Sequence, residues 1–339
     1  MEKWILSLDE VEELTVKALL GSGTLLESAN SMGKAVRAAE RDGIRSHGLL
    51  YLPTYCKHVL CGKVDGSAVP EITKNRSSSI QVDAKTGFAH PAITMGFNEM
   101  YPHLKSNGCV VITVKNSYNC GVLGFHVECI AKRGFIGIGF TNSPASIAPF
   151  GAKKPVIGTN PFAIAIPDKN SEIKFVIDQS ASVVAKSEIL MCAREKTNIP
   201  EGWALDEEGK PTTDPNIGLK GSMVPNGGYK GFSTGLFVEV MAAALSGAML
   251  GIKASPFSGD LGGPPKTGQC FIALDPYAFS GDEFFSNIDN LVEAIQSQDG
   301  ARLPGERRLE QRKISDSKGV EVEKKLIESI QSFFEGKNL

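Results

Sequence analysis

The chain has 339 residues, of which 42% are hydrophobic and 22% are charged, as is typical of a globular protein large enough for two or three sub-domains. A formal net charge of −2 and a pI near 6.3 give no electrostatic reason to expect nucleic acid or an anionic membrane as partner. The seven cysteines are scattered without a Cys-x-x-Cys pair, which favours reduced thiols in the cytoplasm over a metal site.

The N-terminal segment predicts two helices. Ser7 followed by Glu10 is a capping box, and apolar residues at helical spacing continue to the Gly21-Ser-Gly23 segment. A second helix is expected over 30–40. It is followed by the segment GIRSHG at 43–48, in which a hydroxyl and an imidazole are neighbours between two glycines. This motif is either a helix-ending turn or a compact proton-handling unit.

The middle of the chain alternates strands with helices, after a polar connector at 61–77. The β-branched run at 109–114 is typical of a strand covered on both faces. Further strands are expected at 80–82, 135–140, 162–166 and 175–177, with helices over 122–132, 182–195 and 232–250. The helix at 232–250 is apolar all round, which predicts a buried helix.

Two amphipathic helices, at 282–297 and 319–335, end the chain. This order of elements predicts an α/β fold that carries helices from both chain ends. We expect an N-terminal helical region (1–75) to pack with the C-terminal helices of 282–339. The region between them, 76–281, would form a mixed-sheet core that binds nucleotide and substrate.

The chain lacks the Gly-x-Gly-x-x-Gly fingerprint of a Rossmann fold. Gly21-Ser-Gly23 follows a helix instead of a strand, and Gly121 and Gly124 supply only two glycines. In the segment 262–267, prolines remove the backbone donors that a phosphate loop needs. An ordinary Rossmann enzyme and a P-loop enzyme are both disfavoured.

Several other segments could carry chemistry. Residues 119–123 join a buried strand to a helix start, where free N–H groups attract anions. Lys230, in the GGYKG segment, opposes the dipole of the helix that it begins, so an anion would be a natural partner. The segment 302–308 holds three guanidinium groups suited to phosphate. Each of these segments could also be an ordinary turn or a solvated surface loop.

Taken in order, these segments resemble the malate/L-lactate dehydrogenase type 2 family, also called the sulfolactate dehydrogenase-like family. The matching pieces are SHG at 46–48, the strand-turn at 117–123, APFGAKKPVIGTNPFAIAIP at 148–167, DQSAS at 178–182, IPEGWALDEEGKPTTDP at 199–215, GGYKG at 227–231 and LPGE at 303–306. The resemblance implies a non-Rossmann, mixed-sheet α/β fold that binds NAD(P)H, and a homodimer.

Within that family the chain looks most like the Δ1-pyrroline-2-carboxylate/Δ1-piperideine-2-carboxylate reductases, which reduce cyclic imino acids with NADPH. The resemblance implies that His47 is the proton donor, in a charge relay with Ser46 and Glu188. It implies substrate contacts at Tyr51, Thr159, Lys186 and Ser187. The implied nucleotide contacts are Asn119, Cys120, Gly121, Val122, Leu123, Asp178, Gln179, Ser180, Tyr229, Lys230, Arg302, Leu303, Pro304, Gly305, Glu306, Arg307 and Arg308.

Two positions depart from the family pattern. Hydroxy-acid dehydrogenases of the family usually carry a histidine at the position of Asn119, and an amide cannot accept the proton of a hydroxyl group. Asn119 therefore favours an imine over malate or lactate. Tyr51 stands where the family often has an arginine that can hold the substrate carboxylate. Arg45 or backbone donors would have to replace it.

We therefore predict NADPH-dependent reduction of Δ1-pyrroline-2-carboxylate to L-proline and of Δ1-piperideine-2-carboxylate to L-pipecolate, with NADH as a possible cofactor. The alternative in the same class is an NAD-dependent dehydrogenase of malate, lactate or ureidoglycolate. A nucleotide-binding protein without catalysis is a third reading. A hydrolase with Ser46, His47 and Glu188 as its triad is disfavoured, since adjacent residues rarely form such a pair and no Gly-x-Ser-x-Gly elbow exists.

Overall fold

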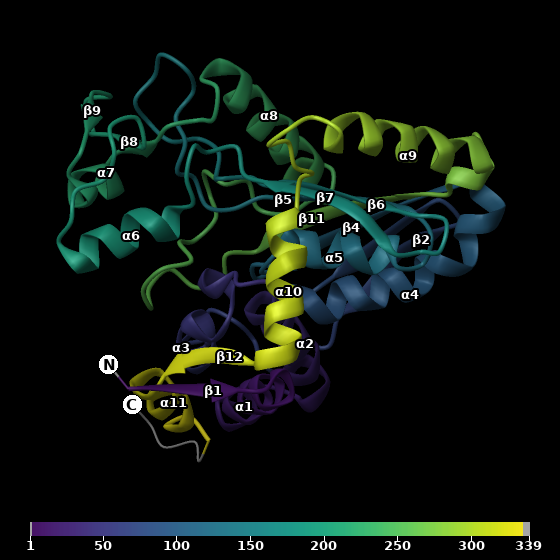
Figure 1. Cartoon of the computed structure of the whole chain (residues 1–339). Coiled ribbons are helices and arrows are strands. Elements are labelled where there is room, and N and C mark those ends of the chain that lie inside the picture. Colours follow the sequence, from purple (N-terminus) through teal and green to yellow (C-terminus); the bar gives the residue numbers. More distant parts are fainter. Residues whose placement is uncertain (1, 335–339) are drawn as a thin grey trace.

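The computed structural model describes residues 2–334 and is organised around a seven-stranded sheet (Figure 1). The strands lie in the order β2 (Glu71–Arg76), β3 (Ser79–Asp83), β4 (Cys109–Ser117), β11 (Thr267–Leu274), β5 (Ile136–Thr141), β6 (Phe162–Pro167) and β7 (Ile173–Gln179). β3 and β4 run parallel, while the other neighbouring pairs are antiparallel. The sheet is therefore mixed, as predicted.

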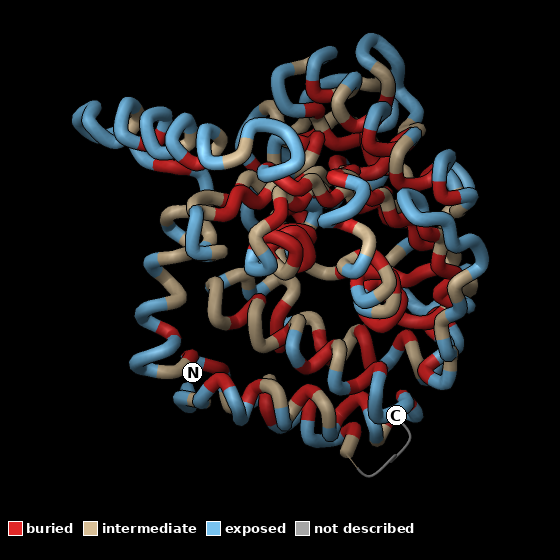
Figure 2. Tube along the Cα trace, turned by 90° about the vertical axis from the view of Figure 1, so that its right-hand side faces the viewer, coloured by how far each residue is buried: buried red, intermediate tan, exposed pale blue. Residues whose placement is uncertain are grey.

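Helices cover both faces of this sheet. On one face, α4 (Ala89–Asn107) packs on β3 and β4, where Val110 and Ile112 are fully buried, and α5 (Leu123–Ala131) packs on β5, β6 and β7. On the other face, α8 (Tyr229–Glu239) and the π-helical turn that follows it (Val240–Ala244) pack on β5 and β11. Buried segments accordingly gather in the interior of the molecule (Figure 2). This packing explains the continuous β-branched sequence of β4.

A second layer combines both ends of the chain. Its members are β1 (Lys3–Leu6), α1 (Leu8–Gly21), α2 (Leu26–Arg41), α3 (Leu52–Leu60), α10 (Glu306–Lys318), β12 (Val320–Glu323) and α11 (Lys324–Gln331). The predicted capping box of Ser7 and Glu10 is present at the start of α1. β1 and β12 pair antiparallel, so the first and last described strands lie side by side. The layer has an apolar core of its own.

Helix α10 runs from the sheet to this second layer (Figure 1). Three of its residues, at successive spacings of four, form ion pairs. Arg308 pairs with Asp178 at the end of β7, Arg312 pairs with Asp42 and Glu128, and Asp316 pairs with Arg41. Residues four apart lie on one face of a helix, so this face of α10 joins β7, α5 and the end of α2.

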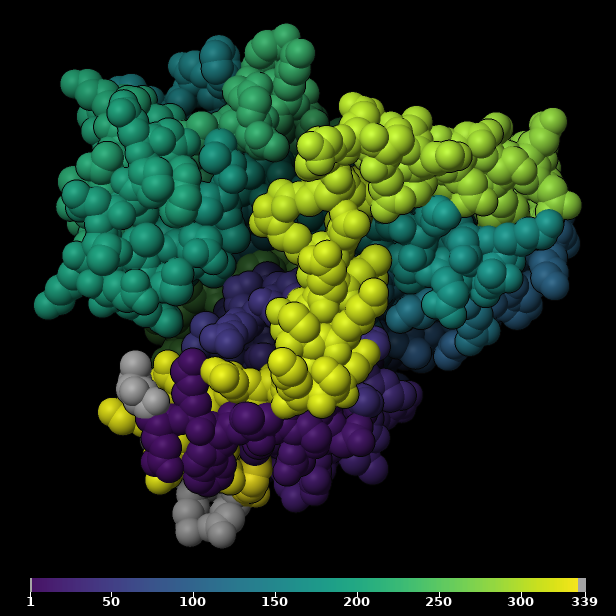
Figure 3. Space-filling view, in the orientation of Figure 1, coloured from purple at the N-terminus to yellow at the C-terminus, as the bar shows by residue number. Residues whose placement is uncertain are grey.

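A smaller lobe follows β7 in the sequence. It contains α6 (Lys186–Glu195), α7 (Pro215–Lys220) and a three-stranded sheet of β8 (Ala204–Leu205), β9 (Pro211–Thr212) and β10 (Ser222–Met223). Its core includes Ile147, Ile157 and Ile189, so the loop before β6 belongs to it. In the space-filling view a recess separates this lobe from the N-terminal layer, and α10 lies along its edge (Figure 3).

Some sequence expectations were wrong in detail. The segment 319–335 does not form one helix: it begins as strand β12, and α11 starts at Lys324. The expected helix over 182–195 begins only at Lys186. The helix expected over 232–250 ends at Glu239 before a π-helical turn, and one side of it is exposed.

The regional division 1–75, 76–281 and 282–339 stays a prediction. Within 282–339, α9 (Asp282–Gln296) lies beside β7, where Asp289 pairs with Lys174 at 2.5 Å, instead of against the N-terminal helices. Met1 and residues 335–339, at the ends of these regions, are outside the described residues.

Candidate active site

Ser46 and His47 lie on a single 3-10 turn (Arg45–His47) between α2 and α3. Ser46 Oγ and His47 Nδ1 are 3.0 Å apart, at hydrogen-bond distance. Because Nδ1 is occupied in this way, Nε2 is the ring nitrogen that can serve a ligand. The two adjacent residues therefore form one polar unit, although such a contact between neighbours in the sequence was expected to be rare.

A buried carboxylate holds this turn in place. Glu40, at the end of α2, accepts a hydrogen bond of 2.7 Å from the backbone N–H of Leu49. Gly48 is required between them, since a Cβ there would lie 2.1 Å from Glu40 Oε1. Burial raises the pKa of Glu40, against the opposing effect of the Leu49 N–H. Sequence reasoning missed Glu40, whose partner is nine residues away.

The electrostatics of His47 come from burial and from one carboxylate. Burial lowers its pKa, and the charge of Asp178 partly reverses this shift. The imidazole is therefore neutral near pH 7. Glu188, the predicted third member of the relay, lies on α6 in the smaller lobe. Within residues 2–334, no hydrogen bond or ion pair links Glu188 to Ser46 or His47, so the relay stays a prediction.

Asp178 is the centre of the predicted nucleotide residues. Its Oδ2 accepts a hydrogen bond of 3.0 Å from the Gly124 N–H, and it pairs with Arg308 Nη2 at 3.1 Å. Gly124 permits this approach, because a Cβ there would lie 2.4 Å from Arg308 Nη1. The strand-turn of 119–123, Asp178 and the 302–308 segment are thereby brought together from three distant parts of the sequence.

The three arginines of the 302–308 segment differ in their exposure to solvent. The Leu303 N–H donates to Glu306 Oε2 at 3.1 Å, and the Pro304 carbonyl accepts from the Val176 N–H at 3.4 Å. Gly305 precedes α10, so Arg307 and Arg308 lie in the first turn of that helix. Arg302 and Arg307 are exposed. Arg308 Nη1 is buried and has no hydrogen-bond partner among the described residues. A buried guanidinium N–H without a partner fits an anionic phosphate group of a nucleotide.

The predicted substrate residues come from several elements. The Tyr51 hydroxyl donates to the carbonyl of Phe257 at 3.1 Å. Thr159 is fixed by Ser143, whose Oγ accepts from its N–H at 3.0 Å. Lys186 and Lys220 line a small cavity of about 190 Å³ in the smaller lobe. Ser187 follows Lys186 in the first turn of α6.

The remaining predicted residues have no common centre. Tyr229 packs against Phe150, with ring centroids 6.3 Å apart, and Lys230 is exposed in the first turn of α8. Gln179 is exposed at the end of β7, and Ser180 Oγ contacts Ser182. Cys120 is buried, which raises the pKa of its thiol to about 12. Such a thiol is not a nucleophile at neutral pH.

A buried lysine fastens the segment that contacts Tyr51. Lys63 has 0% exposure, and its ammonium group donates to the carbonyls of Pro256 and Gly259 at 2.7 and 2.8 Å. His58 Nε2 lies 3.1 Å from the same Gly259 carbonyl. Lys63, in the polar connector predicted at 61–77, thus holds residues 256–259 in place. No motif in the sequence indicated this contact.

Two further histidines lie beneath the strand-turn of 119–123. His126 on α5 donates from Nε2 to the carbonyl of Cys120 at 2.8 Å, and its ring centroid is 5.1 Å from that of His90 on α4. Burial lowers the pKa of His126 to about 4 and that of His90 well below its usual value. Neither residue belongs to a motif used in the sequence analysis.

The pKa of His126 predicts a loss of stability in mild acid. The folded-state pKa is about 4 and the ordinary value is 6.5, so the unfolded chain binds the proton first as the pH falls. The free energy of unfolding should decrease between pH 6.5 and 4, by about 1.4 kcal/mol at pH 5.5 from this residue. Urea unfolding at pH 7.5 and 5.5 should show a smaller loss for His126→Gln than for His103→Gln, which alters an exposed part of α4. Equal losses would contradict the assignment.

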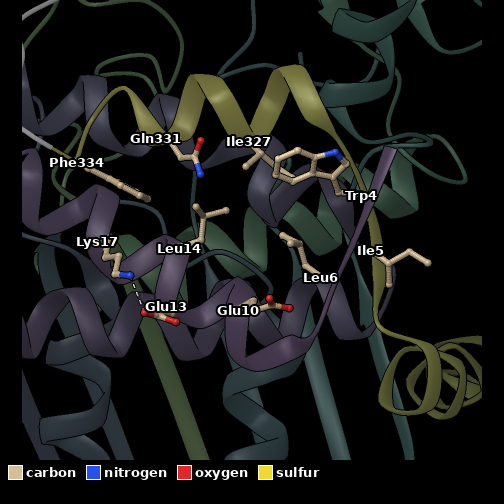
Figure 4. A pocket seen from close by; sticks show the side chains of 10 residues that line it. All are labelled: Trp4, Ile5, Leu6, Glu10, Glu13, Leu14, Lys17, Ile327, Gln331 and Phe334. Carbon is tan, nitrogen blue, oxygen red and sulfur yellow. Dashed lines mark ion pairs between the residues drawn. The ribbon is translucent and has the colours of Figure 1, made fainter. Parts of the chain in front are cut away.

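Another pocket lies elsewhere, where the chain ends meet. It has a volume of about 540 Å³ between β1, α1 and α11, with Trp4, Leu14, Ile327 and Phe334 among its lining residues (Figure 4). Over residues 2–334 no cluster of three or more His, Cys, Asp or Glu side chains could hold a metal ion. In the same part of the chain, no helix combines the length and apolar character needed to cross a membrane.

Comparison with known proteins gives a consistent result. The family model described as "Malate/L-lactate dehydrogenase" matches residues 6–331. The chain belongs to the malate/L-lactate dehydrogenase family. A solved structure of a Δ1-piperideine-2-carboxylate reductase from Pseudomonas syringae is similar to it with a TM-score of 0.91 at 30% identity, covering 97% of this chain and 99% of that one.

Two curated members of the malate/L-lactate dehydrogenase family are similar in sequence but differ in substrate. A (2R)-3-sulfolactate dehydrogenase (NADP(+)) of Chromohalobacter salexigens is 42% identical over 90% of both chains. A Δ1-pyrroline-2-carboxylate reductase of Burkholderia ambifaria is 35% identical over 96% of both chains. The predictions of the family, the fold class and an oxidoreductase are confirmed, and a nicotinamide cofactor is supported.

Proposed function

We propose that this enzyme reduces the C=N bond of cyclic imines that carry a 2-carboxylate, namely Δ1-pyrroline-2-carboxylate and Δ1-piperideine-2-carboxylate. The observation that carries the proposal is the environment of Asn119. Its Oδ1 accepts hydrogen bonds from the Gly121 N–H at 3.1 Å and from the Tyr55 hydroxyl at 3.4 Å. An amide held in this way is no proton acceptor for an alcohol, whereas reduction of an imine needs only a donor at nitrogen.

His47 is the group that supplies this proton. The neutral imidazole first takes up a proton, with Nδ1 held by Ser46, and Nε2 of the imidazolium then gives a proton to the ring nitrogen as that nitrogen becomes an amine. Solvent then returns a proton to the imidazole. The carboxylate of Asp178 favours the protonated form against the effect of burial. In this account Ser46 orients the ring and His47 moves the proton.

The cofactor fits the cluster around Asp178. When it is bound, the reduced nicotinamide supplies the hydride for C2 of the imine. Arg308, with its unpartnered Nη1, would hold a phosphate group, while the turn of 119–123 and the N-terminus of α5 provide backbone donors. Arg302 and Arg307 are the exposed candidates for the additional phosphate of NADPH. We propose NADPH over NADH on this basis.

A second candidate is dehydrogenation of 2-hydroxy acids, with sulfolactate as the most specific case. It is favoured by the 42% identity to the enzyme of Chromohalobacter salexigens. Steady-state assays with NADPH and NADH should compare Δ1-pyrroline-2-carboxylate and Δ1-piperideine-2-carboxylate with sulfopyruvate, oxaloacetate and pyruvate. We expect the highest kcat/KM with a cyclic imine and NADPH. A higher kcat/KM with sulfopyruvate would transfer the proposal to the hydroxy-acid reaction.

We also propose that the enzyme is a homodimer in the cytoplasm. Leu236, Phe237 and Val240 form an apolar surface along α8, with exposures of 46, 52 and 50%. An apolar surface of this kind is typical of a protein interface. It explains why a helix predicted to be buried is half exposed in the single chain.

The dimer predicts a change of mass on substitution. The wild-type enzyme should elute with twice the chain mass of 36.2 kDa in size-exclusion chromatography with light scattering. Phe237→Glu should shift it to the mass of one chain at micromolar concentration, because a buried charge destabilises an apolar interface. Leu20→Glu, at an exposed apolar site on α1, is the matched control. A monomeric wild-type enzyme would contradict the proposal.

A further inference from the structure

The residue that holds the substrate carboxylate is not evident from the family pattern. Tyr51 occupies the position expected for an arginine, and its hydroxyl already donates to Phe257. Arg45 is exposed, and its charge acts on Glu40 and Glu321 on the outer side of the turn. The Tyr51 hydroxyl is therefore engaged, and Arg45 lies in an exposed position near two carboxylates. A different set of donors has to be present.

Gly121 marks a space in which such donors meet. Its φ of +65° suits glycine, and a Cβ at this position would lie 3.3 Å from His90 Nε2 and 3.9 Å from the Tyr55 hydroxyl oxygen. The turn at Gly121 therefore packs closely against an imidazole nitrogen and a phenol hydroxyl. Asn119 lies two residues before it in the same turn.

Neither ring nitrogen of His90, the Nε2 that faces Gly121 or the Nδ1 on the other side of the ring, makes a side-chain hydrogen bond within the described part of the chain. His90 is 2% exposed, and its Nδ1 is buried without a partner among residues 2–334. A buried polar group without a partner costs free energy, so a ligand or an ordered water is expected to complete it.

Tyr55 and Asn119 extend the same donor set. The hydroxyl of Tyr55 reaches Asn119 Oδ1 only at 3.4 Å, a long hydrogen bond that a stronger acceptor can replace. The Asn119 amide accepts through Oδ1, which leaves its NH2 group to donate. Tyr55 is also one helical turn beyond Tyr51, with ring centroids 4.8 Å apart. The set therefore adjoins the substrate side of the 46–51 segment.

We propose that Tyr55, His90 and Asn119 bind the carboxylate of the substrate in the space beside Gly121. This assignment rests on the proposed function in one respect, that the substrate carries a carboxylate. All three side chains donate while neutral, so they suit one carboxylate and do not require a guanidinium group. Hydrogen bonds to a charged acceptor are about twice as strong as those between neutral groups, which makes the site selective for the acid over its amide.

The test measures binding without turnover. Isothermal titration of the NADP+-saturated enzyme with pyrrole-2-carboxylate, oxamate and pyrrole-2-carboxamide would be compared for wild type, Tyr55→Phe, His90→Leu and His90→Gln. His103→Gln, on the exposed part of the same helix, is the control. We expect Tyr55→Phe and His90→Leu to weaken the binding of the acids about 10-fold, as one charge-assisted hydrogen bond implies. Binding of the carboxamide should weaken less than 3-fold, and His90→Gln should recover part of the loss.

The outcomes separate this inference from the proposed function. A cofactor dissociation constant that rises as much as that of the acids would place His90 and Tyr55 in the nucleotide site and overturn the proposal. Unchanged acid binding in Tyr55→Phe, the mildest variant, would also overturn it, as would a wild-type enzyme that binds neither acid. If the acids bind as expected but no cyclic imine is reduced, the carboxylate site stands and the proposed function fails.

Discussion

Substitution of His47 by glutamine is expected to lower kcat for imine reduction by about 10²–10⁴-fold, the usual contribution of a positioned proton donor. The KM for NADPH should change little, because within residues 2–334 His47 interacts with the proposed nucleotide residues through the charge of Asp178 and not through a hydrogen bond. Glutamine keeps a polar side chain in the turn but cannot supply the proton. A rate within threefold of wild type would contradict the role of His47.

The same assay decides the composition of the relay. Ser46→Ala removes the partner of His47 Nδ1 and should lower kcat by about 10-fold, as expected for a lost orienting hydrogen bond. Glu188→Gln tests the predicted third member, which has no hydrogen bond or ion pair with Ser46 or His47 within residues 2–334. A wild-type rate in Glu188→Gln would reduce the relay to Ser46 and His47. His103→Gln again serves as the control.

Substitution of Arg308 by methionine is expected to raise the dissociation constant of NADPH about 100-fold. The guanidinium group joins Asp178 at 3.1 Å and has a buried Nη1 without a partner, so the variant loses both the phosphate contact and the support of Asp178. Two charge-assisted hydrogen bonds amount to about 3 kcal/mol, which corresponds to roughly two orders of magnitude in affinity. Fluorescence titration with NADPH would measure this loss.

Arg307→Met is the matched control, one residue away on the same helix but exposed. It should leave binding of NADH unchanged. If Arg307 contacts the additional phosphate, the variant should weaken NADPH binding selectively, by about 10-fold for one lost ionic hydrogen bond. Equal losses in both variants would mean that the guanidinium groups act by general charge, and the specific role of Arg308 would then be wrong.

The fold was predictable where local patterns agree with the tertiary structure. The capping box of Ser7 and the β-branched run of β4 each specify their element through residues that are close in the sequence. β11, the central strand, was missed because its sequence TGQCFIAL follows a loop rich in glycine and proline without a clear alternation. β12 was read as part of a helix, since its pairing partner β1 is more than 300 residues away. Such long-range pairing leaves no periodic trace in the sequence.

The candidate site was predictable as a set of motifs but not as a geometry. The resemblance implied the Ser46-His47 contact, although adjacent residues rarely form one, and the structure brings Asp178, Arg308 and the 119–123 turn together. Glu40, which supports the catalytic turn, was missed because a buried carboxylate in a helix looks like any solvated helix charge. His90 was missed because its proposed role follows from its closeness to Gly121, which is 31 positions later in the sequence.

The ion-paired face of α10 fixes the number of residues that this helix can contain. Arg308 pairs with Asp178 at 3.1 Å and more distantly with Asp42 at 3.9 Å, whereas Arg312 and Asp316 hold the end of α2, four to six residues before the Ser46-His47 turn. Each residue of an α-helix adds about 100° of rotation. One residue inserted between positions 308 and 312 would turn Arg308 away from Asp178 while leaving the lower pairs intact. We therefore expect α10 to tolerate substitution of many exposed residues but not the insertion of a residue, because an insertion changes the rotation between its two ends.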